Sequence, residues 1–277
     1  MKKFLTVLVA LALVAGFSTS SWAITFSQDT GFDSATLVSD DDGVTSDQDG
    51  DTSNDIKWDT DTTVAIPGDL PVGYSVVDPT APYYSTITWG VSNNSGGADG
   101  DHWGDSDYSG LRVLGFSGDV AEGDWATISR VFHQNNAIST DYATLSSASI
   151  VSFLTVGTVD IDVIAFLFDE TLNASPCSGP GGLGECPDEF TFDASGFAPV
   201  YFFYNGANYL AEFQLANFTD SALTMAGPIW SLWTKEGVTS SVDVQMRLTK
   251  AVPEPTSLLL LGSGLMGMVG FRRKNRS

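Results

Sequence analysis

The chain is poor in histidine, cysteine and basic residues. Its 277 residues include two histidines, two cysteines and 12 lysines and arginines, against 34 aspartates and glutamates. The formal net charge of −22 disfavours nucleic acid as a partner, because phosphate binding relies on lysine and arginine. It also disfavours adhesion to an anionic lipid face. Such a charge favours solubility and the uptake of cations.

The sequence also lacks the familiar hydrolase signatures. There is no Gly-x-Ser-x-Gly elbow and no His-Glu-x-x-His pair. Carboxylates are too plentiful for a glycosidase pair to be chosen from sequence, although Asp169 and Glu170 are the first residues to test. We therefore expect no catalytic site.

The N-terminus has the pattern of a secretory signal peptide. Lys2 and Lys3 precede an apolar run over 4–17, and Ser21-Trp22-Ala23 supplies small residues at the positions that a signal peptidase reads. We expect cleavage after Ala23. Residues 1–23 are therefore set apart from the fold, and the rest of the chain is expected to be exported.

The C-terminus, residues 253–277, has the pattern of a second targeting signal. Pro253, Glu254 and Pro255 are followed by an uncharged apolar run over 256–271, and a basic tail comes last: Arg272, Arg273, Lys274 and Arg276. The run is short for a membrane span, and the tail should stay cytoplasmic. A plain anchor leaves the prolines unexplained, and four glycines make the run a poor soluble helix.

This order of motif, apolar run and basic tail resembles the PEP-CTERM sorting signal of Gram-negative bacteria. The resemblance implies a membrane helix that holds the protein transiently, and recognition and cleavage by an exosortase-type enzyme. It further implies delivery to the cell surface or to an extracellular, polysaccharide-rich matrix such as a biofilm.

Between the two terminal targeting segments, the sequence pattern is that of an all-β protein. Strands are expected at 84–89, 111–116, 125–132, 148–156, 158–168, 190–192, 200–204, 209–215, 229–233 and 241–250. Neither a sustained helical period nor a repeat of fixed length is present. We predict one antiparallel β-sandwich over 64–252, with a jelly roll fitting equally well. Its aromatic residues are expected mainly in the core, with one of Tyr201 and Phe202 outside.

Residues 24–63 are rich in Asp, Ser, Thr and Gly and are interpreted as an acidic, solvated leader. Two aspartate clusters suggest calcium, a hard cation that takes oxygen ligands: Asp47, Asp49 and Asp51 in the leader, and Asp99, Asp101 and Asp105 around His102. The leader cluster fails the EF-hand pattern, because the twelfth position of a loop starting at Asp49 is Thr60. The cluster around His102 could hold calcium or a transition metal, but it has no recognisable ligand spacing for either. A loosely neutralised loop and a polar surface turn are the alternatives.

Cys177 and Cys186 are the two cysteines and are predicted to form a disulfide, because the protein is expected to be exported. The glycine-rich loop between them is flexible enough to bring its ends together. Closing it should contribute roughly 2–3 kcal/mol on a chain-entropy argument.

His133 and Asn135 lie at the end of a predicted strand. Together with Trp89-Gly90, Ser109-Gly110-Leu111 and residues 168–190, this stretch resembles an exported family named for a Thr-His-x-Asn (THxN) motif, although Phe132 replaces its threonine. The resemblance implies a fold and a location, without an established reaction. The His-x-Asn pair either locks a turn through side-chain hydrogen bonds or binds a ligand.

Together these patterns predict a non-enzymatic structural or adhesive matrix component. The alternative is a secreted hydrolase, or a calcium-dependent carbohydrate-binding module, acting on exopolysaccharide.

Overall fold

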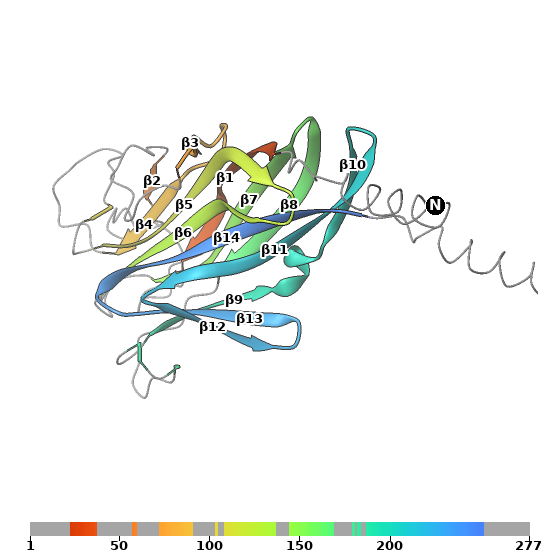
Figure 1. Ribbon diagram of the computed structural model, residues 1–277. Helices are drawn as coiled ribbons and strands as arrows, with labels where there is room; N and C mark the ends of the chain where they lie inside the picture. Colours follow the sequence, from red (N-terminus) through yellow and green to blue (C-terminus); the bar gives the residue numbers. More distant parts are fainter. Residues whose placement is uncertain are drawn as a thin grey trace, which may run out of the picture.

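The computed structural model describes residues 23–37, 57–59, 72–90, 103–104, 108–136, 144–168, 179–180, 182–183 and 187–251. These residues form an all-β, antiparallel structure (Figure 1). The strands described are β1 (Ala23–Leu37), β2 (Lys57–Asp59), β3 (Ser75–Val77), β4 (Thr86–Gly90), β5 (Tyr108–Ala121), β6 (Trp125–Asn135), β7 (Leu145–Val156), β8 (Val159–Phe168), β9 (Asp188–Asp193), β10 (Val200–Tyr204), β11 (Ala207–Thr219), β12 (Ser221–Ala226), β13 (Ile229–Thr234) and β14 (Val238–Lys250). A short 3-10 turn, η2 (Ala194–Phe197), precedes β10.

The main sheet has eleven strands, and its principal path runs β10-β11-β14-β6-β5-β1-β7-β8. It curls so strongly that β10 and β8, the two ends of this path, contact each other. A three-stranded sheet, β12-β13-β9, packs against it, with β9 against β8 and β12 against β14 (Figure 1). The all-β antiparallel prediction is confirmed. The predicted sandwich is not clearly formed, because the main sheet nearly closes on itself.

All ten predicted strands are present, because their alternating apolar residues line one core. On β14, Val242, Val244, Met246 and Leu248 are all buried. Phe190, Phe192 and Leu232 of the small sheet belong to the same core cluster. Tyr201 is exposed and Phe202 is buried, as alternation requires. Phe153 and Phe203 are exposed and depart from the prediction that the aromatic residues lie mainly in the core.

The leader interpretation fails for the start of the exported region. β1 pairs with β5 on one side and with β7 on the other, and it buries Ile24, Phe26 and Phe32. It was not apparent as a strand because Gln28 and Thr30 occupy inward positions. Both are buried, and the Thr30 hydroxyl lies 2.7 Å from that of Ser152.

Two glycines allow the close approaches that this curled sheet needs. Gly206 and the preceding Asn205 both have positive φ and make the two-residue turn between β10 and β11. At Gly115 of β5, an added Cβ would collide with the backbone carbonyl of Gln28 on β1. Only glycine lets β1 cross β5 at this distance.

Candidate functional site

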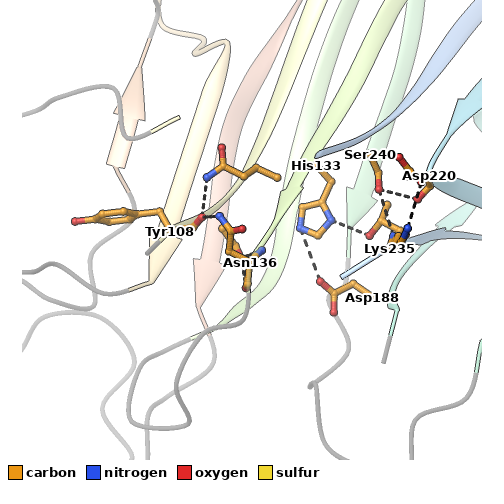
Figure 2. A network of polar contacts seen from close by, with 10 residues as sticks. Tyr108, His133, Asn136, Asp188, Asp220, Lys235 and Ser240 are labelled. Atoms are coloured by element: carbon orange, nitrogen blue, oxygen red, sulfur yellow. Dashed lines mark hydrogen bonds and ion pairs between the residues drawn. The ribbon is translucent and has the colours of Figure 1, made fainter. Parts of the chain in front are cut away.

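His133 and Asn135 lie at the end of β6, in the seam between the main sheet and the small sheet. In the β6–β14 register, His133 is opposite Ser240 and Asn135 is opposite Val238. Residues two apart on a strand share a face, so both side chains point to the same side of the sheet. Figure 2 shows His133 joined by a dashed line to Asp188 below it, with Ser240, Lys235 and Asp220 grouped to its right.

The His133 ring connects β6 with both neighbouring strands of the small sheet. Its Nδ1 lies 2.8 Å from Oγ1 of Thr234 on β13, a hydrogen-bond distance. Its Nε2 lies 3.8 Å from Oδ2 of Asp188 on β9, which is too long for a hydrogen bond. Asp188 and Thr234 are direct partners in the β9–β13 register, so the small sheet presents them to the ring together.

Two aromatic rings fix the orientation of the imidazole. Trp89 of β4 stacks nearly parallel to it, with centroids 6.1 Å apart and an interplanar angle of 11°. Phe190 of β9 meets it edge-on, with centroids 4.7 Å apart. His133 is 2% exposed, Thr234 2% and Asp188 0%. The cluster is therefore internal to the protein.

Burial sets the charge of this cluster. It lowers the pKa of His133 from 6.5 to about 3. It also raises the pKa of Asp188 from 3.8 to about 8, with a further contribution from the negative charge of Glu236. Both groups are thus neutral at pH 7, and the contact between them is not an ion pair. A neutral carboxyl costs less to bury than an ionised one.

The neighbours of the His-x-Asn pair provide the strand-end lock. Gln134 and Asn136 point to the other side of β6, where their amide nitrogens donate to the carbonyl of Tyr108 at 2.8 and 2.7 Å. The Ser109 hydroxyl donates to the Asn136 carbonyl at 2.8 Å (Figure 2 shows Tyr108 and Asn136). These bonds tie the end of β6 to the start of β5.

Asn135 itself is fully buried, and its side-chain amide has no hydrogen-bond partner among the residues described. The same holds for both oxygens of Asp188 and for Nε2 of His133. The backbone of Asn135, in contrast, is hydrogen-bonded, since the Asn135 carbonyl accepts from the amide of Gly237 at 2.7 Å. Of the two motif residues, His133 therefore carries the side-chain contact between the sheets.

The space beside the cluster is small. A small cavity beside His133, lined by Leu111, Phe190 and Ser240 among others, has room for roughly one water molecule. A substrate side chain or sugar ring does not fit there. Within the described parts of the chain, no three histidine, cysteine or acidic side chains converge to hold a metal ion.

A second buried polar cluster lies on the other face of β14. The Asp243 carboxylate accepts hydrogen bonds from both Nε and Nη2 of Arg130, at 2.5 and 3.2 Å. It also accepts the Asn217 amide at 2.7 Å and the Thr127 hydroxyl at 3.2 Å. This arrangement joins β6, β11 and β14, and it satisfies a carboxylate that is almost completely buried.

Most other sequence-predicted sites lie outside the described residues. These are the sorting motif Pro253, Glu254 and Pro255, the basic tail Arg272, Arg273, Lys274 and Arg276, the cysteines Cys177 and Cys186, and the aspartates Asp47, Asp49, Asp51, Asp99, Asp101 and Asp105. Their predicted roles stay predictions. None of the helical segments among the described residues is long and apolar enough to cross a membrane.

Sequence reasoning missed Asp188 and Thr234 as partners of His133. Thr234 is 101 residues from His133, and no local pattern marks it. For Asp188 there was a signal, since residues 168–190 and Trp89 belong to the stretches that carry the Thr-His-x-Asn resemblance. The structure brings Trp89, Ser109, His133 and Asp188 to one end of the sheet.

Residues 251–274 match the PEP-CTERM protein-sorting motif. No curated protein matches the chain closely enough to count as a relative. The motif implies an exported protein that an exosortase processes and sorts to the cell surface, in agreement with the order of prolines, apolar run and basic tail.

Proposed function

We propose that the exported β body is a non-enzymatic structural or adhesive component of the extracellular matrix, released after its C-terminal handle has been removed. The observation that carries this proposal is the burial of the His133 cluster. A histidine that is 2% exposed and neutral at pH 7 joins two sheets and does not meet a solvent-borne substrate. We also propose membership of the Thr-His-x-Asn family, whose motif stretches converge on this seam.

The charge of the protein supports a matrix setting. Between residues 24 and 252 there are 33 acidic and six basic residues. An acidic body stays soluble and takes up cations, which are abundant counterions in acidic polysaccharide. Calcium bridging between such a body and a polysaccharide is the form of adhesion that this charge favours.

The proposal is tested on the secreted protein, incubated with the exopolysaccharide of its own host, with and without calcium. We expect the protein to sediment with the polysaccharide while no new reducing ends are formed. As a localisation control, alanines in place of Pro253, Glu254 and Pro255 should leave the protein in the membrane fraction and deplete it from the matrix.

The rival function is a secreted hydrolase acting on the same polysaccharide. It is established if reducing ends accumulate and if Asp169→Asn with Glu170→Gln abolishes their formation. Asp33→Asn, an exposed carboxylate on β1, is the matched control and should leave any activity unchanged. Turnover that meets both conditions overturns the structural proposal.

A further inference from the structure

Two large aromatic side chains stand exposed on the same face of β10. Tyr201 is 72% exposed and Phe203 is 64% exposed, whereas Phe202 between them packs into the core. β10 is an end strand of the main path of the sheet, and among the described strands it pairs with β11 alone. Neither ring is needed to fill the core, so both are available to contact something outside the protein.

These rings lie next to the point where the chain leaves the β body. Phe203 is opposite Asn208 in the β10–β11 register, and the Asn208 carbonyl accepts the amide of Ala251 at 2.8 Å. Phe203 and Ala251 are therefore two strand spacings apart, about 10 Å. Figure 1 shows β10 and the end of β14 at the same end of the molecule.

Ala251 is also the first residue of the sorting motif. The apolar run that follows begins at Thr256, and five extended residues span at most about 18 Å. While the C-terminal run is in the membrane, the β10–β11 hairpin is thus held close to the lipid surface. The polar interfacial layer on each side of a bilayer is roughly 5–8 Å thick, so the hairpin can reach it.

The chemistry of the hairpin suits that layer. Aromatic rings, tyrosine above all, prefer the membrane–water interface because one part of the ring is apolar and its hydroxyl stays wet. A lipid surface therefore fits both the position and the composition of this patch.

We propose that, before processing, the β10–β11 hairpin docks on the membrane that holds the C-terminal run, with Tyr201 and Phe203 in the headgroup layer. The docking fixes the orientation of the β body above the membrane. It also keeps Pro253, Glu254 and Pro255 in the plane where a membrane-embedded processing enzyme acts. Cleavage of the C-terminal run then frees Tyr201 and Phe203 from the membrane.

The test uses the full chain reconstituted in phosphatidylcholine vesicles, with the photocrosslinking residue p-benzoylphenylalanine in place of Phe203. The control carries the same residue in place of Phe218, which is 38% exposed. Phe218 lies towards the far end of β11, about 30 Å along the strand from Asn208. Both positions are exposed aromatics on the surface, so neither replacement disturbs the core.

After flotation of the vesicles and irradiation, we expect lipid adducts at position 203 to exceed those at position 218 several-fold. Tyr201→Ser in the Phe203 probe chain should reduce the adducts. Equal labelling at the two positions, or adducts that stay at background in chains that float, overturns the docking and leaves the matrix role untouched. Chains that do not float at all overturn the docking together with the membrane handle on which it depends.

Discussion

Asp188→Asn is the substitution that tests the neutral cluster most directly. Asparagine keeps the shape of the aspartate and cannot ionise. In the native protein, the pKa of Asp188 is raised from 3.8 to about 8, and that of His133 is lowered from 6.5 to about 3. The two shifts have opposite effects on stability as the pH changes, and this separates them experimentally.

The informative window lies between pH 6.5 and pH 8. Here Asp188 is ionised in the unfolded chain, and its protonated fraction in the folded chain falls to about half at pH 8. His133 is neutral in the folded chain, and its protonated fraction in the unfolded chain falls from about half at pH 6.5 to almost none at pH 8. Folding therefore takes up less than one proton, so the free energy of unfolding falls as the pH rises, by less than about 1.4 kcal/mol per pH unit. The loss across the window is about 1 kcal/mol. Below the window, the stabilisation that Asp188 gains on acidification is offset by the stability lost at His133.

The assay is urea denaturation followed by tryptophan fluorescence, at several pH values from 6 to 8.5. We expect native stability to decline through the window and that of Asp188→Asn to stay level or rise slightly, because only His133 still titrates differently in the two states. Asp33→Asn, an exposed carboxylate, should keep the native decline. A native protein whose stability rises or stays level from pH 6.5 to pH 8 would show that Asp188 is ionised in the folded protein. The conclusion that His133 and Asp188 are both neutral there would then be wrong.

Substitutions at four further positions probe contacts within and between the sheets, each by chemical denaturation. Thr234→Val leaves the buried imidazole without its hydroxyl partner and should cost about 1–3 kcal/mol, whereas Thr234→Ser keeps the hydroxyl and should cost less. Asp243→Asn breaks a buried bidentate pair and should cost about 3–5 kcal/mol. Glu212→Gln breaks a pair that is about a third exposed and should cost less than about 1 kcal/mol; equal losses at the two sites would contradict this ranking. Gly115→Ala forces β1 away from β5 and should cost at least about 1–3 kcal/mol; native stability in this variant would show that the two strands are not in close contact.

The strands were readable from sequence where one face is apolar throughout. β14 alternates Val242, Val244, Met246 and Leu248 with polar residues, and its position was predicted within a few residues. β1 was missed because its inward face mixes apolar residues with Gln28 and Thr30, which become acceptable only when a neighbour such as Ser152 is present. A buried hydrogen bond between strands that are far apart in sequence does not produce a hydrophobic periodicity in either strand.

The polar face of β14 shows the same limit. Alternation placed Asp243 opposite the core, and a surface position was the natural reading. In the structure Asp243 is almost completely buried, because Arg130 of β6 and Asn217 of β11, the two strands that flank β14, reach it and satisfy its charge. The strand order that brings β6 and β11 to either side of β14 cannot be predicted from any one segment.

The position of His133 at a strand end could be predicted, but its role could not. Its partners come from β9 and β13, and they meet it only because Asp188 and Thr234 share a register position in a separate sheet. That register is itself sensitive to the cluster. A slip of one residue between β13 and β9 would separate the pair, and a slip of β13 as a whole would turn Thr234 to the opposite face.

In a slipped register, His133 Nδ1 would stay buried without its partner, at a cost of about 1–3 kcal/mol. An apolar trio at these positions would tolerate the slip far better, since hydrophobic contacts have little directional preference. The cluster therefore stabilises one packing of the small sheet on the main sheet, even though its neutral carboxyl lowers stability towards alkaline pH. For a body that has to fold after export, selection of one register at this seam is a physical reason to keep a histidine inside a core.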